Sequence, residues 1–157
     1  MIVEELVTTG DPKLPAANRV FALDPATGHS IWERELGPGA KPGGFATATP
    51  AVVEGLVYIS GIVDGTTQAL SVKDGSVKWT TKVPGAGAGL VVGDRTVYVA
   101  AGPKLVALSR AEGKAAGSVE VGGFIGPATP LLAGDTIFVT NLYGWIHAVP
   151  VSAFTPR

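Results

Sequence analysis

The residues best suited to acid–base or nucleophilic chemistry are two histidines, His29 and His147, and the serines and aspartates around them. A Ser-His-Asp site needs a histidine within hydrogen-bond reach of both a serine and an orienting carboxylate. Asp24 and His29 flank one turn without a nucleophile, and His147 lies much later in the chain. The serines occupy repeated positions, and none fits a strand-to-helix nucleophile elbow. We therefore predict no catalytic residue in this chain.

Metal, phosphate and cofactor sites also lack their sequence signals. The chain has no cysteine, which excludes disulfides and thiolate metal sites. Its aspartates lie mostly in turns, and no cluster shows the spacing of metal ligands. Residues 85–89 read Gly-Ala-Gly-Ala-Gly, but neither a Lys-Ser/Thr pair nor a helix follows, as a phosphate-binding loop requires. We interpret this segment as a linker and predict neither a metal site nor a cofactor site.

Composition narrows the classes of partner. The 157 residues carry a formal net charge of −1, so nucleic acid and anionic membrane surfaces are not expected partners. Mean hydropathy is +0.34, yet no apolar run approaches the roughly 20 residues that a membrane-spanning helix needs. The first residues lack the basic region and long apolar core of a signal peptide. The apolar residues occur in short pieces, as in strands that are buried on both faces.

An internal repeat of 40 residues organises the chain. Similar apolar strands begin at Val57, Val97 and Ile137, and each follows another short strand that ends in a glycine-containing turn. Such turns favour tight hairpins. A third strand in each unit carries a small residue followed by an apolar one, as at Ala69 and Ala107. Four strands in about 40 residues, without helical periodicity, are typical of a β-propeller blade.

The predicted fold class is therefore all-β, with β-propeller blades of four antiparallel strands, here called A to D. We expect residues 1–157 to form a single partial propeller of about four blades with an incomplete ring. The expected blades span residues 1–37 (strands B to D), 46–84, 86–122 and 124–151 (strands A to C). The first and last units would then each lack one strand.

The junction between strands C and D resembles the repeat of PQQ-like, or quinoprotein alcohol dehydrogenase-like, propellers. Residues 22–32 read Ala-Leu-Asp-Pro-Ala-Thr-Gly-His-Ser-Ile-Trp, and residues 69–79 keep the alanine, the glycine and the tryptophan. In the third copy, Gly117 stands at the tryptophan position. The resemblance implies that the tryptophans wedge between blades and that the glycines permit the turn. The residues expected to dock the blades are Trp32, Trp79, Gly28, Gly75 and Gly113.

The resemblance also sets expectations about function. Members that bind the quinone PQQ use a vicinal disulfide and a calcium site, so PQQ is not expected in a chain without cysteine. Relatives include an outer-membrane assembly lipoprotein that holds other proteins, quinoprotein dehydrogenases, and propellers fused to metallophosphoesterases. The resemblance favours a periplasmic or extracellular location. We expect a non-catalytic scaffold or binding module, or alternatively the propeller portion of an enzyme whose active site lies outside this chain.

An incomplete ring leaves apolar blade faces that something must cover. Three explanations stay open: the chain is the C-terminal part of a larger repeat protein, it pairs with another copy in a homo-oligomer, or it closes as a small four-bladed ring. A candidate contact patch lies at the turn between strands B and C of the last unit. It comprises Asn141, Tyr143, Trp145 and His147, which either contact a partner or cover the end of the propeller.

Overall fold

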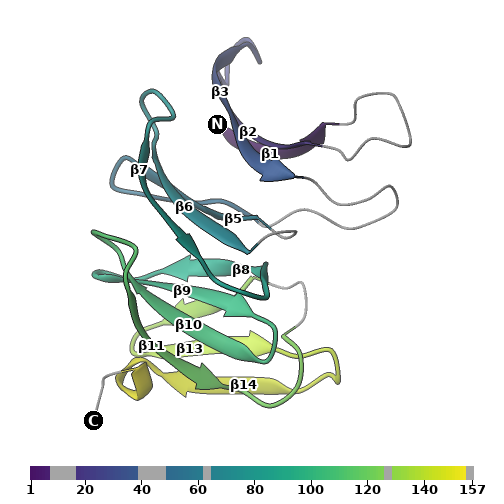
Figure 1. Ribbon diagram of the computed structural model, residues 1–157, viewed down its shortest axis with the longest axis vertical. Coiled ribbons are helices and arrows are strands. Elements are labelled where there is room, and N and C mark those ends of the chain that lie inside the picture. The colour runs from purple at the N-terminus through teal and green to yellow at the C-terminus, as the bar shows by residue number, and fades with distance from the viewer. Residues whose placement is uncertain (8–16, 39–48, 62–64, 126–128, 155–157) are drawn as a thin grey trace.

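The computed structural model describes residues 1–7, 17–38, 49–61, 65–125 and 129–154. These residues form fourteen strands and one short 3-10 turn, arranged as four separate antiparallel sheets. Figure 1 shows the sheets following one another in chain order, with the first and the last at opposite ends of the molecule. The prediction of an all-β fold built from propeller-type sheets is therefore confirmed. Among the described residues, the sheets do not close into a ring.

Each sheet is a meander in which consecutive strands pair. Blade 1 contains β1 (Ile2–Val7), β2 (Ala17–Leu23) and β3 (Ser30–Pro38). Blade 2 contains β4 (Ala51–Val53), β5 (Leu56–Ser60), β6 (Thr66–Ser71) and β7 (Val77–Lys82). Blade 3 contains β8 (Ala86–Val92), β9 (Thr96–Ala101), β10 (Lys104–Ser109) and β11 (Ala115–Glu120). Blade 4 contains β12 (Leu131–Ala133), β13 (Thr136–Thr140) and β14 (Ile146–Pro150), and η1 (Val151–Phe154) follows it.

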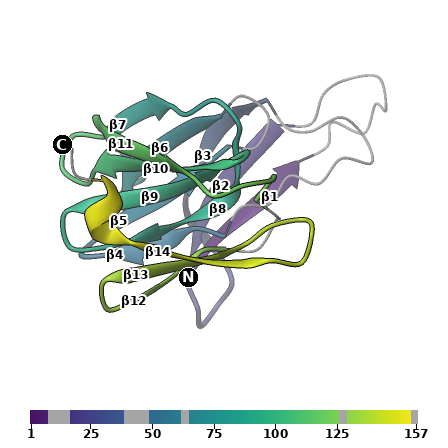
Figure 2. The same cartoon turned by 90° about the horizontal axis from the view of Figure 1, so that it is seen from below.

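The hydrophobic core lies in the seams between successive blades rather than inside one sheet. Figure 2, seen from the blade 4 end, shows the sheets one behind another. Each seam buries apolar side chains from both of its blades. The buried clusters are Val20, Leu36, Val57, Ile59 and Leu70 between blades 1 and 2; Tyr58, Trp79, Leu90, Val97 and Leu108 between blades 2 and 3; and Tyr98, Leu105, Ile137, Val149 and Phe154 between blades 3 and 4.

The turn that joins the third and fourth strands has the same conformation in blades 1, 2 and 3. A glycine closes each turn with a positive φ of 67–73°, which residues with a Cβ rarely adopt. Its N–H donates to the carbonyl four residues earlier. The three pairs are Gly28 to Asp24 at 2.8 Å, Gly75 to Ser71 at 2.9 Å, and Gly113 to Ser109 at 2.7 Å. These turns place the seam residues described next. No helix in the described part of the chain is long and apolar enough to cross a membrane.

Candidate functional site

The two motif tryptophans lie across blade seams, each against a glycine of the following blade. Trp32 of β3 packs over Gly75, where an added Cβ would stand 2.8 Å from the indole ring. Its indole N–H donates to the carbonyl of Val72 at 2.8 Å. Arg34, two residues after the tryptophan, donates from Nε to the carbonyl of Gly75 at 3.0 Å. The turn of blade 2 therefore receives a ring and two hydrogen bonds from blade 1.

The next seam repeats this arrangement with different side chains. Trp79 of β7 packs over Gly113, where an added Cβ would stand 2.5 Å from the ring. The indole N–H donates to the carbonyl of Arg110 at 2.9 Å, and Thr81 Oγ1 donates to the carbonyl of Gly113 at 2.7 Å. Trp79 is also near Tyr58 of its own blade, with ring centroids 6.0 Å apart. Only a residue without a side chain fits under either indole.

The third seam reverses the large and small partners. Gly117 of β11 stands at the tryptophan position, and Phe154 stands six residues after Ala148, at the position that glycine occupies in the other turns. An added Cβ at Gly117 would stand 2.6 Å from the carbonyl oxygen of Phe154. The Phe154 ring is buried and lies 5.1 Å from the ring of Tyr98, centroid to centroid. Figure 1 shows η1 beside β11.

Phe154 of blade 4 therefore packs beside Tyr98 of blade 3. Trp79 packs beside Tyr58 in the equivalent way, but both of these residues belong to blade 2. We did not predict this role for Phe154, although its spacing from Ala148 was a usable signal. Gly28 differs from Gly75 and Gly113 because no ring from the described residues lies over it. It is exposed, and an added Cβ there would meet nothing within 4 Å.

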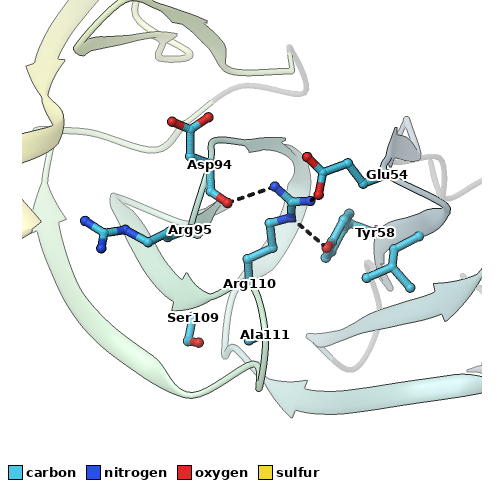
Figure 3. Close-up of a pocket in the computed structure, with 8 residues that line it drawn as sticks. Glu54, Tyr58, Asp94, Arg95, Ser109, Arg110 and Ala111 are labelled. Atoms are coloured by element: carbon cyan, nitrogen blue, oxygen red, sulfur yellow. Dashed lines mark hydrogen bonds and ion pairs between the residues drawn. The ribbon is translucent and has the colours of Figure 1, made fainter.

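A polar network at the seam of blades 2 and 3 centres on Arg110 (Figure 3). Arg110 donates from Nε to the hydroxyl of Tyr58 at 3.2 Å and from an Nη to the carbonyl of Asp94 at 2.8 Å. Its other Nη forms an ion pair with Glu54 in the β4–β5 turn. The hydrogen bond with Tyr58, and then Glu54, raises the pKa of Arg110 above its ordinary value. Sequence reasoning missed this network, which no local motif signals.

These four residues line a pocket of about 560 Å³ that opens between the two blades. All three guanidinium nitrogens of Arg110 already have protein partners, so the group acts as a clamp between blades. In Figure 3, Arg95 points away from Arg110, and Ser109 lies apart from the charged groups. The arrangement holds two sheets together and presents no nucleophile beside a base.

The candidate contact patch is organised by Asn141. Its Oδ1 accepts hydrogen bonds from the backbone N–H groups of Tyr143 and Trp145, both at 3.0 Å. Its Nδ2 donates to the carbonyl of Gly122 at 2.9 Å and lies 3.2 Å from His147 Nε2. Asn141 is buried, whereas Tyr143 and Trp145 are 75% and 67% exposed. The structure thus brings Asn141 and His147 together and holds two aromatic rings in solvent.

The remaining titratable residues do not converge on one place. His29 is exposed in the third-to-fourth-strand turn of blade 1, whereas His147 lies in blade 4. Asp74 accepts a hydrogen bond from the N–H of Ser76 at 3.0 Å, and this bond, with those of the Ser76 and Ser71 side chains, lowers its pKa to about 2. Within the described segments, no three His, Cys, Asp or Glu residues are grouped closely enough to hold a metal ion. These residues do not fit a site for PQQ and its calcium ion.

Comparison with known proteins places the chain among these propellers. Residues 5–85 and 63–152 match the family described as outer membrane protein assembly factor BamB. Two curated relatives are named tetrathionate hydrolase. The chain is 31% identical to that of Acidithiobacillus ferrooxidans over 145 residues and 32% identical to that of Acidianus ambivalens over 117 residues. These matches cover 88% and 68% of this chain but only 29% and 22% of the relatives.

Solved structures show the same fold at lower identity. BamB from Moraxella catarrhalis superposes with a TM-score of 0.67 at 20% identity, over 88% of this chain and 44% of that one. The quinohemoprotein alcohol dehydrogenase ADHIIG of Pseudomonas putida HK5 superposes with a TM-score of 0.59 at 23% identity, over 66% of this chain and 18% of that one. Both likenesses concern the fold. The chain therefore spans less than half of each protein that it matches here.

Proposed function

The chain belongs to the PQQ-like propeller family described as outer membrane protein assembly factor BamB, and we propose that its blades are a non-catalytic scaffold within a larger propeller. The resemblance seen in the sequence motif is confirmed by this match. The scaffold contributes rigid blades and a rim for contact with another protein or with the rest of its own propeller.

This proposal rests on the polar side chains at the seams, which donate hydrogen bonds from one blade to the next. Arg110, Arg34 and Thr81 have the geometry of ordered, well-directed donors, which active sites also use. Each of them donates to a neighbouring blade. These two arginines therefore stabilise the stack of sheets.

The contact patch supplies the surface that such a scaffold would offer. Tyr and Trp are enriched at the centres of protein interfaces because each buries a large area at a low cost in conformational entropy. Tyr143 and Trp145 are held outward by a buried asparagine, so their backbone is fixed before any partner arrives. A fixed backbone lowers the entropy that is lost on binding.

The test of the scaffold proposal is an assay of the purified chain with tetrathionate, the compound in the names of the curated relatives. We expect no loss of tetrathionate above a buffer control. Loss that tracks the folded protein, and that disappears when urea unfolds it, would refute a non-catalytic role for these residues.

A second candidate is favoured by the curated relatives, because both carry an enzyme name. In this case the chain is the propeller portion of a tetrathionate hydrolase-like enzyme, with the active site outside these residues. In the longer enzyme, His29→Ala and His147→Ala should then leave kcat for tetrathionate unchanged. A large loss of kcat with an unchanged melting temperature in either variant would place catalysis in this chain.

A further inference from the structure

Asn141 connects the turn between β13 and β14 (residues 141–145) to the segment that enters blade 4 (residues 121–125). Its Nδ2 donates to the carbonyl of Gly122 at 2.9 Å, and its backbone forms an antiparallel bridge with Ile125. Its Oδ1 accepts hydrogen bonds from two backbone N–H groups of the turn itself, both at 3.0 Å. One buried side chain therefore fixes both the internal shape of the turn and its position on the blade.

The hydrogen bonds around Asn141 leave only one orientation for its amide. Two backbone N–H groups donate to the same amide atom, which must be the oxygen because the NH2 group only donates. The NH2 group has two hydrogens. One is donated to the carbonyl of Gly122, and the second is left for His147 Nε2, 3.2 Å away. Nε2 must accept this second hydrogen bond, because the NH2 group has no lone pair to offer.

An accepting Nε2 defines the protonation state of His147. A neutral imidazole carries one proton, so here that proton lies on Nδ1. An imidazolium has N–H groups on both nitrogens and cannot accept. Protonated His147 would thus set an N–H against the NH2 group of Asn141. The amide cannot rotate to relieve this contact, because its oxygen already holds the N–H groups of Tyr143 and Trp145.

We propose that His147 is a proton-sensitive switch that orders the β13–β14 turn when its imidazole is neutral and releases the turn when it is protonated. Histidine is the side chain that ordinarily changes charge between about pH 5 and 8. Acidification through this range should break the contact with Asn141 and loosen the turn that carries Tyr143 and Trp145. If these two rings are the contact surface of the proposed function, on which this step alone rests, that surface is ordered at neutral pH and mobile in acid.

The segments around His147 carry few other titratable groups. From the segment that enters blade 4 to the end of β14, the only Asp, Glu, Lys or Arg is Asp135, which lies at the opposite end of β13 from this turn. Just before that stretch, Glu120 forms an ion pair with Lys104 at 3.3 Å. Tyr143 carries a phenol, and phenols ordinarily titrate near about pH 10. Mild acid should therefore act on the turn through His147.

NMR of the 157-residue chain tests the tautomer. His147 becomes the only imidazole in the chain when the other histidine is replaced by His29→Gln. At about pH 8, above the range in which histidine ordinarily titrates, the ring nitrogen shifts should show a protonated Nδ1 and an unprotonated Nε2. The opposite tautomer would overturn the proposal, because an Nε2 that carries a proton cannot accept from Asn141.

The response of the turn can be followed by fluorine NMR after incorporation of 5-fluorotryptophan. The chain has three tryptophans, and Trp145→Phe identifies the resonance of Trp145. As the pH is lowered from about 8 to about 5, this resonance should shift with the same midpoint as the His147 ring. Those of Trp32 and Trp79, which lie in the seams, should stay in place. A Trp145 resonance that does not follow the titration of His147 would show that the imidazole leaves the turn undisturbed, and the switch would be wrong.

His147→Gln is the matched control. Gln68 occupies the equivalent position of blade 2 in the register of the second and third strands, so this type of blade accommodates glutamine there. The amide oxygen of glutamine accepts hydrogen bonds at any pH, so the Trp145 resonance of this variant should lose its pH dependence. A retained shift would contradict the role of His147. If this variant does not fold, the tautomer and the two midpoints in the His29→Gln chain still decide. None of these results involves tetrathionate, so the switch and the scaffold proposal can fail separately.

Discussion

The reversed seam between blades 3 and 4 allows a test by exchange of its large and small residues. The double variant Gly117→Trp/Phe154→Gly restores the order found at the other two seams, where a tryptophan lies over a glycine. Each single change breaks the fit, because Gly117→Trp adds an indole where Phe154 already lies, and Phe154→Gly removes the ring that packs against Tyr98. We therefore expect the two single variants to be less stable than their combination.

The magnitudes follow from the geometry. Phe154 is 7% exposed and contacts Tyr98, so its loss should destabilise the fold by about 3–5 kcal/mol, as for other buried aromatic side chains. Gly117→Trp places a Cβ only 2.6 Å from a backbone oxygen, and such overpacking destabilises by about 1–3 kcal/mol. Independent effects would total about 4–8 kcal/mol. With the ring restored, the double variant should lose about 1–3 kcal/mol, since only repacking strain remains.

Urea unfolding, followed by circular dichroism, measures the free energies needed for a double-mutant cycle. We expect a coupling energy of at least about 1 kcal/mol between Gly117→Trp and Phe154→Gly. Phe154→Gly combined with Trp145→Ala is the control, because Trp145 is exposed and should add independently. A double variant that loses the sum of the single losses would show that Phe154 does not replace a tryptophan.

Four further predictions concern the other seams, one turn and the assembly. Trp79→Ala should destabilise by about 3–5 kcal/mol in urea unfolding, whereas exposed Trp145→Ala should change stability by under about 0.5 kcal/mol. Arg110→Met should lower the urea midpoint of unfolding because Glu54 and Tyr58 lose their hydrogen-bond partner across the seam. Arg95→Met, which lies outside the clamp, should leave the midpoint unchanged. Equal midpoints for the two variants would exclude the clamp. The lowered pKa of Asp74 stabilises the folded state above about pH 4, and this contribution is lost as the pH falls from 3.8 towards 2. Asp74→Asn should therefore flatten the acid limb of the stability curve, and an unchanged limb would contradict the assignment. Sedimentation at micromolar concentration should give a monomer, because the strand tryptophans Trp32 and Trp79 already pack within their own chain; a stable dimer would be contrary to this.

The fold could be predicted from the sequence because its signals are local and repeated. The 40-residue period, the glycine turns and the short apolar strands each depend on neighbouring residues, and the repeat supplies several independent readings of one pattern. The resemblance to PQQ-like propellers depends on the same local spacing of alanine, glycine and tryptophan.

The contacts of the seams were harder to predict, because they join residues that are distant in sequence. Trp32 and Val72 are 40 residues apart, and Arg110 and Glu54 are 56 residues apart. Motif spacing identified the tryptophans and their glycines as a set, but it did not pair Trp32 with Gly75 or assign their hydrogen bonds. The Arg110 clamp had no motif at all, since its four members meet only after two blades have packed.

The two outer ends of the described stack of sheets differ in their chemistry. The blade 1 end presents the exposed Gly28 turn. The blade 4 end presents Phe138, which is 37% exposed although its counterparts Tyr58 and Tyr98 are buried. A surface that fits one end would leave the other end either empty or overpacked. The two ends are therefore not self-complementary copies of one patch, so a two-fold symmetric contact cannot use both of them at once.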